Sequence, residues 1–98
     1  MSQLNRVTLK RLAEKYIWWK TPDETLVQPE RLFAQVMNIG DYDDVFTLVD
    51  SIGEKALREV LARAEIGQFS KRSWAYWHYR LGLALPEQVP PMPSRKVV

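Results

Sequence analysis

Apolar residues recur every three or four positions along most of this sequence, and single glycines or prolines interrupt the pattern. Such spacing places the apolar residues on one face of a helix, whereas a half-buried strand would alternate apolar and polar residues. No segment of this sequence alternates in that way. The pattern therefore predicts a series of helices and no strands.

The first helix is predicted from its cap and its apolar stripe, and a capped turn is predicted after it. Thr8 has a position typical of an N-cap, and the stripe that follows it consists of Leu9, Leu12, Ala13, Tyr16 and Ile17. The segment Thr-Pro-Asp-Glu at residues 21–24 is a capping-box signature with proline at the first helical position. Pro29 restarts the chain soon afterwards, so we expect this signature to open only a short turn.

A second helix is predicted to begin at Pro29 and to end at Gly40. Its apolar face consists of Leu32, Phe33, Val36 and Met37. Gly40 has the position of a C′ glycine, a residue that commonly ends a helix in a left-handed backbone conformation.

Two further helices are predicted on either side of Gly53. The earlier one has Asp41 as its N-cap, Asp43 and Asp44 in its first turn, and a buried face of Val45, Leu48, Val49 and Ile52. Carboxylates are favourable there because the N-terminus of a helix is electropositive. The later helix has Ala56, Leu57, Val60, Leu61 and Ala64 on its buried face, and Gly67 is expected to terminate it.

The last predicted helix is unusually rich in rings. The segment Ser-Lys-Arg-Ser-Trp-Ala-Tyr-Trp-His-Tyr-Arg at residues 70–80 holds five aromatic rings and three cations, begins with a serine cap and is expected to end near Gly82. One face of this helix consists of Trp74, Trp77, His78 and Leu81, which we predict to be core. The rings of Tyr76 and Tyr79 point elsewhere. They either pack under Trp18, Trp19 and the proline-rich C-terminus, or form an exposed surface for a partner.

These elements predict an all-α fold, in which residues 1–84 form one compact bundle of about five short helices. Residues 85–98 contain four of the six prolines and cannot continue as a helix. They are expected to form an extended, Pro-rich basic tail that includes Arg95. Val89 and Met92 favour docking of this tail on the domain, and reaching out toward a partner is the alternative.

The sequence offers little for catalysis or for metal binding. It has no cysteine and a single histidine, His78, which excludes a conventional zinc site. The carboxylates of Asp41, Asp43 and Asp44 resemble a magnesium site, but no glycine-rich phosphate loop accompanies them and helix capping explains them. No serine lies in a Gly-x-Ser-x-Gly turn. We therefore expect no enzymatic activity, no cofactor and no metal.

Charge is strongly segregated along the chain. Residues 1–20 carry a net charge of +4 and residues 21–50 of −6, whereas residues 51–70 are neutral and residues 71–98 return to +4. This asymmetry indicates either an oriented contact with a partner or a segregation without functional meaning. No apolar run resembles a signal peptide or approaches the roughly 18 to 20 residues that span a bilayer. We expect a soluble, cytoplasmic protein without a membrane partner.

A nucleic-acid-binding function is one alternative. The two helices that flank residues 66–69 resemble a helix-turn-helix, and Lys71, Arg72 and Arg80 are suited to contact phosphates. A recognition helix, however, usually presents short polar side chains to the bases, whereas this helix presents Trp and Tyr.

Residues 29–83 resemble a family of small bacterial helical proteins. The shared pattern comprises a Gly-Asp-x-x-Asp step, a Gly-x-x-x-Leu-Arg-x-Val-Leu segment and a serine-capped, Trp-containing helix ending in Leu-Gly. In this chain these are Gly40, Asp41 and Asp44; Gly53, Leu57, Arg58, Val60 and Leu61; and Ser70, Trp77, Leu81 and Gly82. The family is similar to the presumed antitoxins encoded beside AbiEii/AbiGii-type nucleotidyltransferase toxins.

The resemblance implies a non-catalytic protein that restrains a nucleotidyltransferase-type toxin by binding to it. The antitoxins best known beside such toxins carry a winged-helix domain that binds DNA, and this sequence has no segment suited to a β-wing. From composition we predict that the partner contacts Asp43, Asp44, Tyr76, Tyr79, Arg80, Met92 and Arg95. An exposed ring patch could also serve a homodimer.

Overall fold

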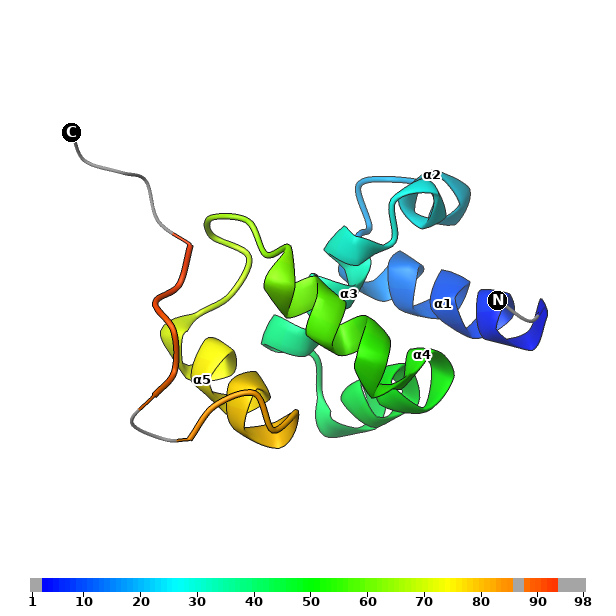
Figure 1. The fold of residues 1–98 in the computed structure, drawn as a ribbon. Helices are drawn as coiled ribbons and strands as arrows, with labels where there is room; N and C mark the ends of the chain where they lie inside the picture. Colours follow the sequence, from blue (N-terminus) through cyan, green and yellow to red (C-terminus); the bar gives the residue numbers. More distant parts are fainter. Residues whose placement is uncertain (1–2, 86–87, 94–98) are drawn as a thin grey trace.

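The protein is described by a computed structural model that covers residues 3–85 and 88–93. The described residues form five helices and no strand, which confirms the predicted compact all-α fold. In chain order the helices are α1 (Gln3–Tyr16), α2 (Pro22–Val27), α3 (Glu30–Ile39), α4 (Tyr42–Ala62) and α5 (Lys71–Arg80), as Figure 1 shows. None of the described helices combines the length and the apolarity that crossing a membrane requires.

Three of the predicted N-caps are confirmed. The hydroxyl of Thr21 accepts a hydrogen bond from the backbone N–H of Glu24, whose carboxylate accepts one from the N–H of Thr21. Asp41 caps α4, and Ser70 caps α5 through the N–H of the third helical residue. The prediction that Thr8 caps the first helix is wrong, because α1 begins at Gln3 and Thr8 lies inside it. No glycine or proline precedes Thr8, so nothing in the backbone prevents the helix from starting earlier.

Glycines interrupt or end the later helices in two different ways. Gly53 has φ 79° and breaks α4 into two arms, which correspond to the two helices predicted there. Gly82 has φ 68° at the end of α5. The N–H of Leu83 donates to the carbonyl of His78 at 2.9 Å and that of Gly82 to Tyr79 at 3.1 Å, as in a Schellman motif.

The predicted end of α3 is confirmed, because the helix ends at Ile39 with Gly40 as its C-cap, whereas the expected conformation of Gly40 and the expected role of Gly67 are not found. The backbone of Gly40 has φ −64° and is extended, so the C′ interpretation is wrong. A Cβ atom at this position would instead overlap the carbonyl oxygen of Val36, which explains why glycine fits there. Gly67 has φ 83° but lies in the loop beyond α4, which already ends at Ala62.

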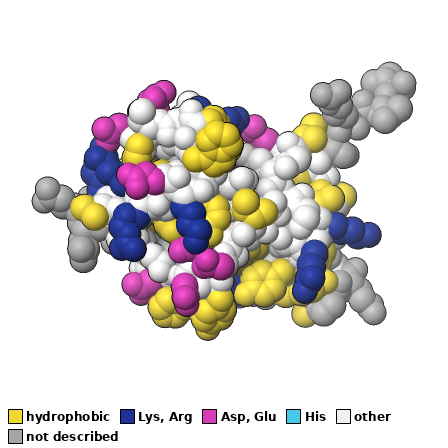
Figure 2. All heavy atoms as spheres, turned by 180° about the vertical axis from the view of Figure 1, so that it is seen from behind, with side chains coloured by type: hydrophobic (Ala, Val, Ile, Leu, Met, Phe, Trp, Pro, Cys, Tyr) yellow, Lys and Arg dark blue, Asp and Glu magenta, His cyan; other side chains and the backbone are white. Residues whose placement is uncertain are grey.

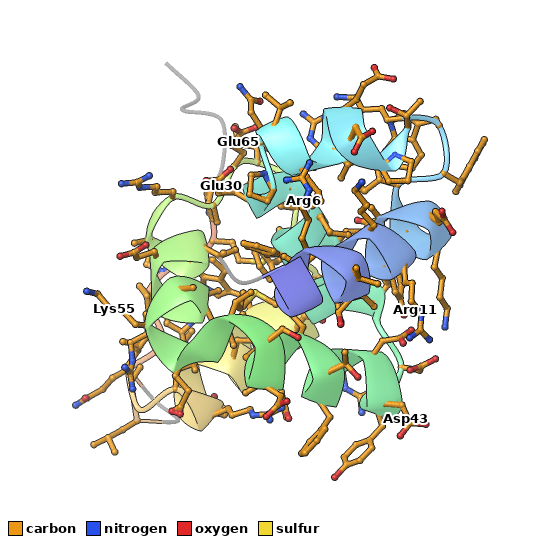
Figure 3. All side chains as sticks on the ribbon, turned by 90° about the vertical axis from the view of Figure 1, so that its right-hand side faces the viewer. Arg6, Arg11, Glu30, Asp43, Lys55 and Glu65 are labelled. Atoms are coloured by element: carbon orange, nitrogen blue, oxygen red, sulfur yellow. The ribbon has the colours of Figure 1, made fainter. Side chains whose placement is uncertain are left out.

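Helix α3 is the centre of the bundle. It packs against α1, α2, α4 and α5. The predicted stripes supply the core, whose most buried aliphatic members are Leu9, Ile17, Leu32, Val36, Leu48 and Leu57. Charged side chains such as Arg11, Asp43 and Lys55 point away from the helices (Figure 3). One face of each helix is thus buried on α3 or its neighbours, and the other faces solvent.

Residues 88–93 have neither helical nor strand structure and run beside α5. Val89 and Met92 pack against the core, and the indole N–H of Trp74 donates to the carbonyl of Pro90 at 2.8 Å. The rings of Trp18 and Trp19 lie against each other, with centres 5.6 Å apart, in the exposed turn after α1. Trp18 and Trp19 are mostly exposed, and Tyr76 and Tyr79 are about half exposed, so the alternative that these α5 rings pack under the tryptophan pair is wrong.

Candidate functional site

Helix α5 has one fully buried face, as the sequence predicts. Trp74, Trp77, His78 and Leu81 are all buried, and only 1% of Trp77 is exposed. The indole N–H of Trp77 donates to the carbonyl of Met37 at 2.8 Å, which ties α5 to α3. The Nδ1 atom of His78 lies 2.7 Å from the carbonyl of Trp74 and must donate in that bond, because a carbonyl only accepts. These residues hold the fold together.

The opposite side of α5 contributes to an exposed surface that we call the aromatic groove. Its walls are Tyr42 and Phe46 from the start of α4 and Tyr76 and Arg80 from α5; Met37, Gly40, Val45 and Trp77 complete it. The three wall rings are 84%, 60% and 50% exposed, in the order Tyr42, Phe46 and Tyr76. The groove encloses about 220 Å³. Figure 2 shows hydrophobic side chains gathered along the lower edge of the molecule, over α4 and α5.

Two local spacings and one packing relation create this groove. Tyr42 and Phe46 are four residues apart on α4, and Tyr76 and Arg80 are four residues apart on α5, so each pair shares a helix face. Both helices pack on α3, which brings the two pairs to the same side of the bundle. The groove is therefore a property of the tertiary structure.

Arg80 is held in place by rings. Its guanidinium carbon lies 5.0 Å from the centre of the Trp77 ring and 5.9 Å from that of Tyr76. Its Nη1 atom donates to the hydroxyl of Tyr76 at 3.0 Å. No acidic side chain of residues 6–85 or 88–93 forms an ion pair with Arg80. The result is an exposed cation with a fixed orientation at the edge of an apolar groove.

A second polar cluster, which we call the polar junction, joins the end of α1 to the start of α4. It consists of Lys15, Tyr16, Asp41 and Asp44. The Nζ atom of Lys15 lies 3.0 Å from Asp41 and 2.6 Å from Asp44. The hydroxyl of Tyr16 donates to Asp44 at 2.6 Å and accepts from the backbone N–H of Asp41 at 3.3 Å. Every polar group of the junction thus has a partner within the chain.

The electrostatics of the polar junction follow from these contacts. The N–H of Asp44 and the ammonium of Lys15 hold the pKa of Asp41 below its usual value. Hydrogen bonds from Lys15 to Asp44 and Asp41 raise the pKa of Lys15. Burial, followed by the hydrogen bond to Asp44, raises the pKa of Tyr16. Basic residues of α1 thus pair with acidic residues of the segment that follows, so part of the charge asymmetry in the sequence is neutralised by ion pairs within the molecule.

The structure separates the predicted contact residues into three groups. Tyr76 and Arg80 lie together in the aromatic groove, and Asp43 is exposed beside Tyr42 and forms no ion pair with any described residue. Asp44 is engaged in the polar junction and Met92 is partly buried against the core, so both have roles within the fold. Tyr79 is exposed but does not line the groove. Arg95 lies outside the described residues.

Sequence reasoning missed Tyr42 and Phe46, which form the α4 wall of the groove. A signal for them does exist. They are a ring pair at helical spacing that falls off the apolar stripe of Val45, Leu48 and Val49, on the side where polar residues are expected.

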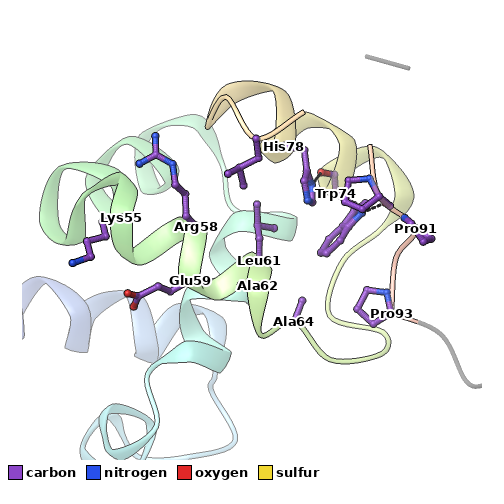
Figure 4. Close-up of a pocket in the computed structure, with 12 residues that line it drawn as sticks. Lys55, Arg58, Glu59, Leu61, Ala62, Ala64, Trp74, His78, Pro91 and Pro93 are labelled. Atoms are coloured by element: carbon purple, nitrogen blue, oxygen red, sulfur yellow. Dashed lines mark hydrogen bonds between the residues drawn. The ribbon is translucent and has the colours of Figure 1, made fainter. Parts of the chain in front are cut away.

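A wider groove lies between the second arm of α4, α5 and the proline-rich segment (Figure 4). It encloses about 690 Å³, and Leu61, Trp74, His78 and Pro91 are among the residues that line it. Its best-placed polar groups are used for structure, since the guanidinium of Arg58 donates to the carbonyl of Leu81 at 3.2 Å. Within the part of the chain that the structure describes, no three His, Asp or Glu side chains converge as metal ligands would.

Comparisons of this chain with protein families, with curated proteins and with solved structures find no match. The resemblance to antitoxin-like helical proteins stays a prediction from the sequence.

Proposed function

We propose that this protein is a non-catalytic protein-binding module and that it acts as an antitoxin, which neutralises a nucleotidyltransferase-type toxin by direct binding. The nature of the partner comes from the family resemblance. The mode of action comes from the surface chemistry of the described residues.

The observation that carries the proposal is the aromatic groove. Three exposed rings and one arginine surround an apolar base, and Tyr and Arg are among the residues most enriched in binding hot spots. A monomeric protein gains nothing in stability from leaving Tyr42 or Phe46 in water, since burying a large apolar side chain is worth about 1.5–3 kcal/mol. A partner that covers these rings would recover that free energy.

The groove is also suited to binding without rearrangement. Its walls stand on two helices that pack on α3, and Arg80 is already oriented by Tyr76 and Trp77. A preorganised surface loses little conformational entropy when it binds. Asp43 remains available for a cation of the toxin, whereas Asp44 is used by the polar junction and is left out of the proposed interface.

The test is reconstitution with an identified partner. The tagged protein is purified from its native host, the captured protein is identified by mass spectrometry, and growth rescue is measured when both are co-expressed. We expect a nucleotidyltransferase-type toxin whose toxicity the wild-type chain suppresses. Phe46→Ala should lose suppression, and Trp18→Ala, which removes an exposed ring outside the groove, should keep it. Absence of such a partner together with absence of rescue would refute the antitoxin proposal.

A nucleic-acid-binding function is the second candidate, because Lys71 and Arg72 are both exposed in the first turn of α5. That position offers two cations and an electropositive helix end to a phosphate. If this candidate is right, the protein binds duplex DNA or RNA with an affinity that falls steeply with salt, and the double variant Lys71→Ala/Arg72→Ala loses it.

A further inference from the structure

We propose that the aromatic groove binds a peptide segment of the partner in which a large apolar side chain lies beside an aspartate or glutamate. This inference rests on the proposed protein-binding function and adds the chemistry of the ligand. The apolar side chain would enter the groove between Tyr42, Phe46 and Tyr76. The neighbouring carboxylate would pair with Arg80.

The size of the groove favours a side chain over a small molecule. Its volume of about 220 Å³ is below the roughly 300–1,000 Å³ of typical small-molecule pockets. Its base is apolar, since Met37 and Trp77 are buried and Val45 is packed against the core. The indole N–H of Trp77 already donates to the carbonyl of Met37 and is therefore not available to a ligand. The base therefore offers hydrophobic contact and selects an apolar anchor.

The state of Arg80 favours a carboxylate. Lys10, Lys15 and Arg58 each pair with an acidic side chain, whereas Arg80, like several other exposed cations, pairs with none among residues 6–85 and 88–93. Arg80 instead has two rings and a tyrosine hydroxyl as neighbours. Stacking leaves the edge of a guanidinium available, and that edge matches a carboxylate in two parallel hydrogen bonds. An acidic residue of a partner would complete this arrangement.

The negative charge of Asp43, on the α4 side, argues against a phosphate backbone as the ligand. Asp43 lies directly beside Tyr42 and is exposed, so a polyanion lying along the groove would meet its negative charge. A peptide places one carboxylate at Arg80 and can keep the α4 side neutral or basic. Charge complementarity thus selects a peptide and also sets its direction across the groove.

The experiment selects ligands without assuming a partner. The full chain is immobilised and used to select from a displayed library of random peptides, and the affinities of synthetic peptides are measured by fluorescence polarisation. We expect selected peptides to share a large apolar residue within a few positions of Asp or Glu. Their binding should weaken at least tenfold, about the effect of a hot-spot residue, in Phe46→Ala and in Arg80→Glu. Selection on the Arg80→Glu protein should yield Lys or Arg in place of the acid.

Two matched variants control for general effects. Arg72→Glu reverses another exposed cation of α5, and Trp18→Ala removes an exposed ring that lies outside the groove. Both should bind the selected peptides like the wild type. Circular dichroism of each variant confirms that the helices are retained.

Several outcomes would overturn the inference. These are selected peptides without an acid, peptides that bind Phe46→Ala as well as the wild type, failure to select any peptide, and displacement by duplex DNA. A dimer in sedimentation that Phe46→Ala dissociates would show that a second copy occupies the groove. Failure of the peptide inference can be distinguished from failure of the antitoxin proposal. If a toxin still binds the Arg80→Glu variant, only the peptide inference is refuted. If acidic-apolar peptides bind but no toxin partner is found, only the antitoxin assignment is refuted.

Discussion

The polar junction and the aromatic groove both include residues from the start of α4. Their side chains differ in whether they have partners within the chain. In the junction, Asp44 receives hydrogen bonds from Lys15 and Tyr16. In the groove, Tyr42 and Phe46 face solvent, and Asp43, which follows Tyr42 but does not line the groove, forms no ion pair with any described residue. The polar groups of the junction are paired within the chain, whereas the rings of the groove remain exposed to solvent.

The difference shows how to tell residues that build this fold from residues that are available to a partner. Both regions would be described from composition alone as clusters of acids, rings and cations. Only the presence or absence of an internal partner separates them. Substitutions in the two regions should therefore differ in their effect on stability.

The largest effect is expected at the base of the groove. Trp77→Ala should lower the free energy of unfolding by about 3–5 kcal/mol, because it empties a buried site and leaves the carbonyl of Met37 without its donor. Urea denaturation followed by far-UV circular dichroism measures the change. The adjacent Tyr76→Ala should cost less than about 1 kcal/mol, because the ring is half exposed. Equal losses in the two variants would mean that the groove wall belongs to the core.

A smaller effect should separate the two neighbouring aspartates of α4. Asp44→Ala should cost about 1–2 kcal/mol, because the part-buried hydroxyl of Tyr16 loses a charged acceptor. Asp43→Ala should change the free energy of unfolding by less than about 0.5 kcal/mol. Both substitutions remove one negative charge from the same helix turn, so the helix-dipole effect is matched between them. Thermal unfolding of both variants at neutral pH measures the difference, and a reversed order would contradict the role given to Asp44.

The smallest effect concerns acid stability. The pKa of Asp41 is lowered in the folded protein from an ordinary value of 3.8, so the folded state binds protons less readily than the unfolded chain. The stabilisation is complete above that ordinary value and is lost as the pH falls through the lowered pKa. Unfolding free energies measured down this acid range should fall less steeply in Asp41→Asn and in Lys15→Gln than in the wild type. Unchanged slopes in both variants would show that the junction contributes nothing to acid sensitivity.

Prediction from the sequence was best where one local pattern decides the structure. The capping box at Thr21 and the caps at Asp41 and Ser70 are each set by residues within one helical turn, and the buried face of α5 by residues within two turns. Prediction was poorest where a role was assigned only because the residue type is common in that role. Thr8 resembles a cap but nothing stops α1 from beginning earlier, and Gly40 resembles a C′ glycine but is required by a close approach to Val36.

Hydrophobic periodicity and capping act over a few residues, so they suffice to predict that this protein is helical, where most of its helices begin and which faces are buried. Which charges and rings have internal partners depends instead on how the helices pack. Lys15 reaches Asp44 across 29 positions in sequence, and Tyr42 meets Tyr76 in one groove because two helices pack on a third. No local pattern encodes such distances, because they depend on how all the buried faces pack at once.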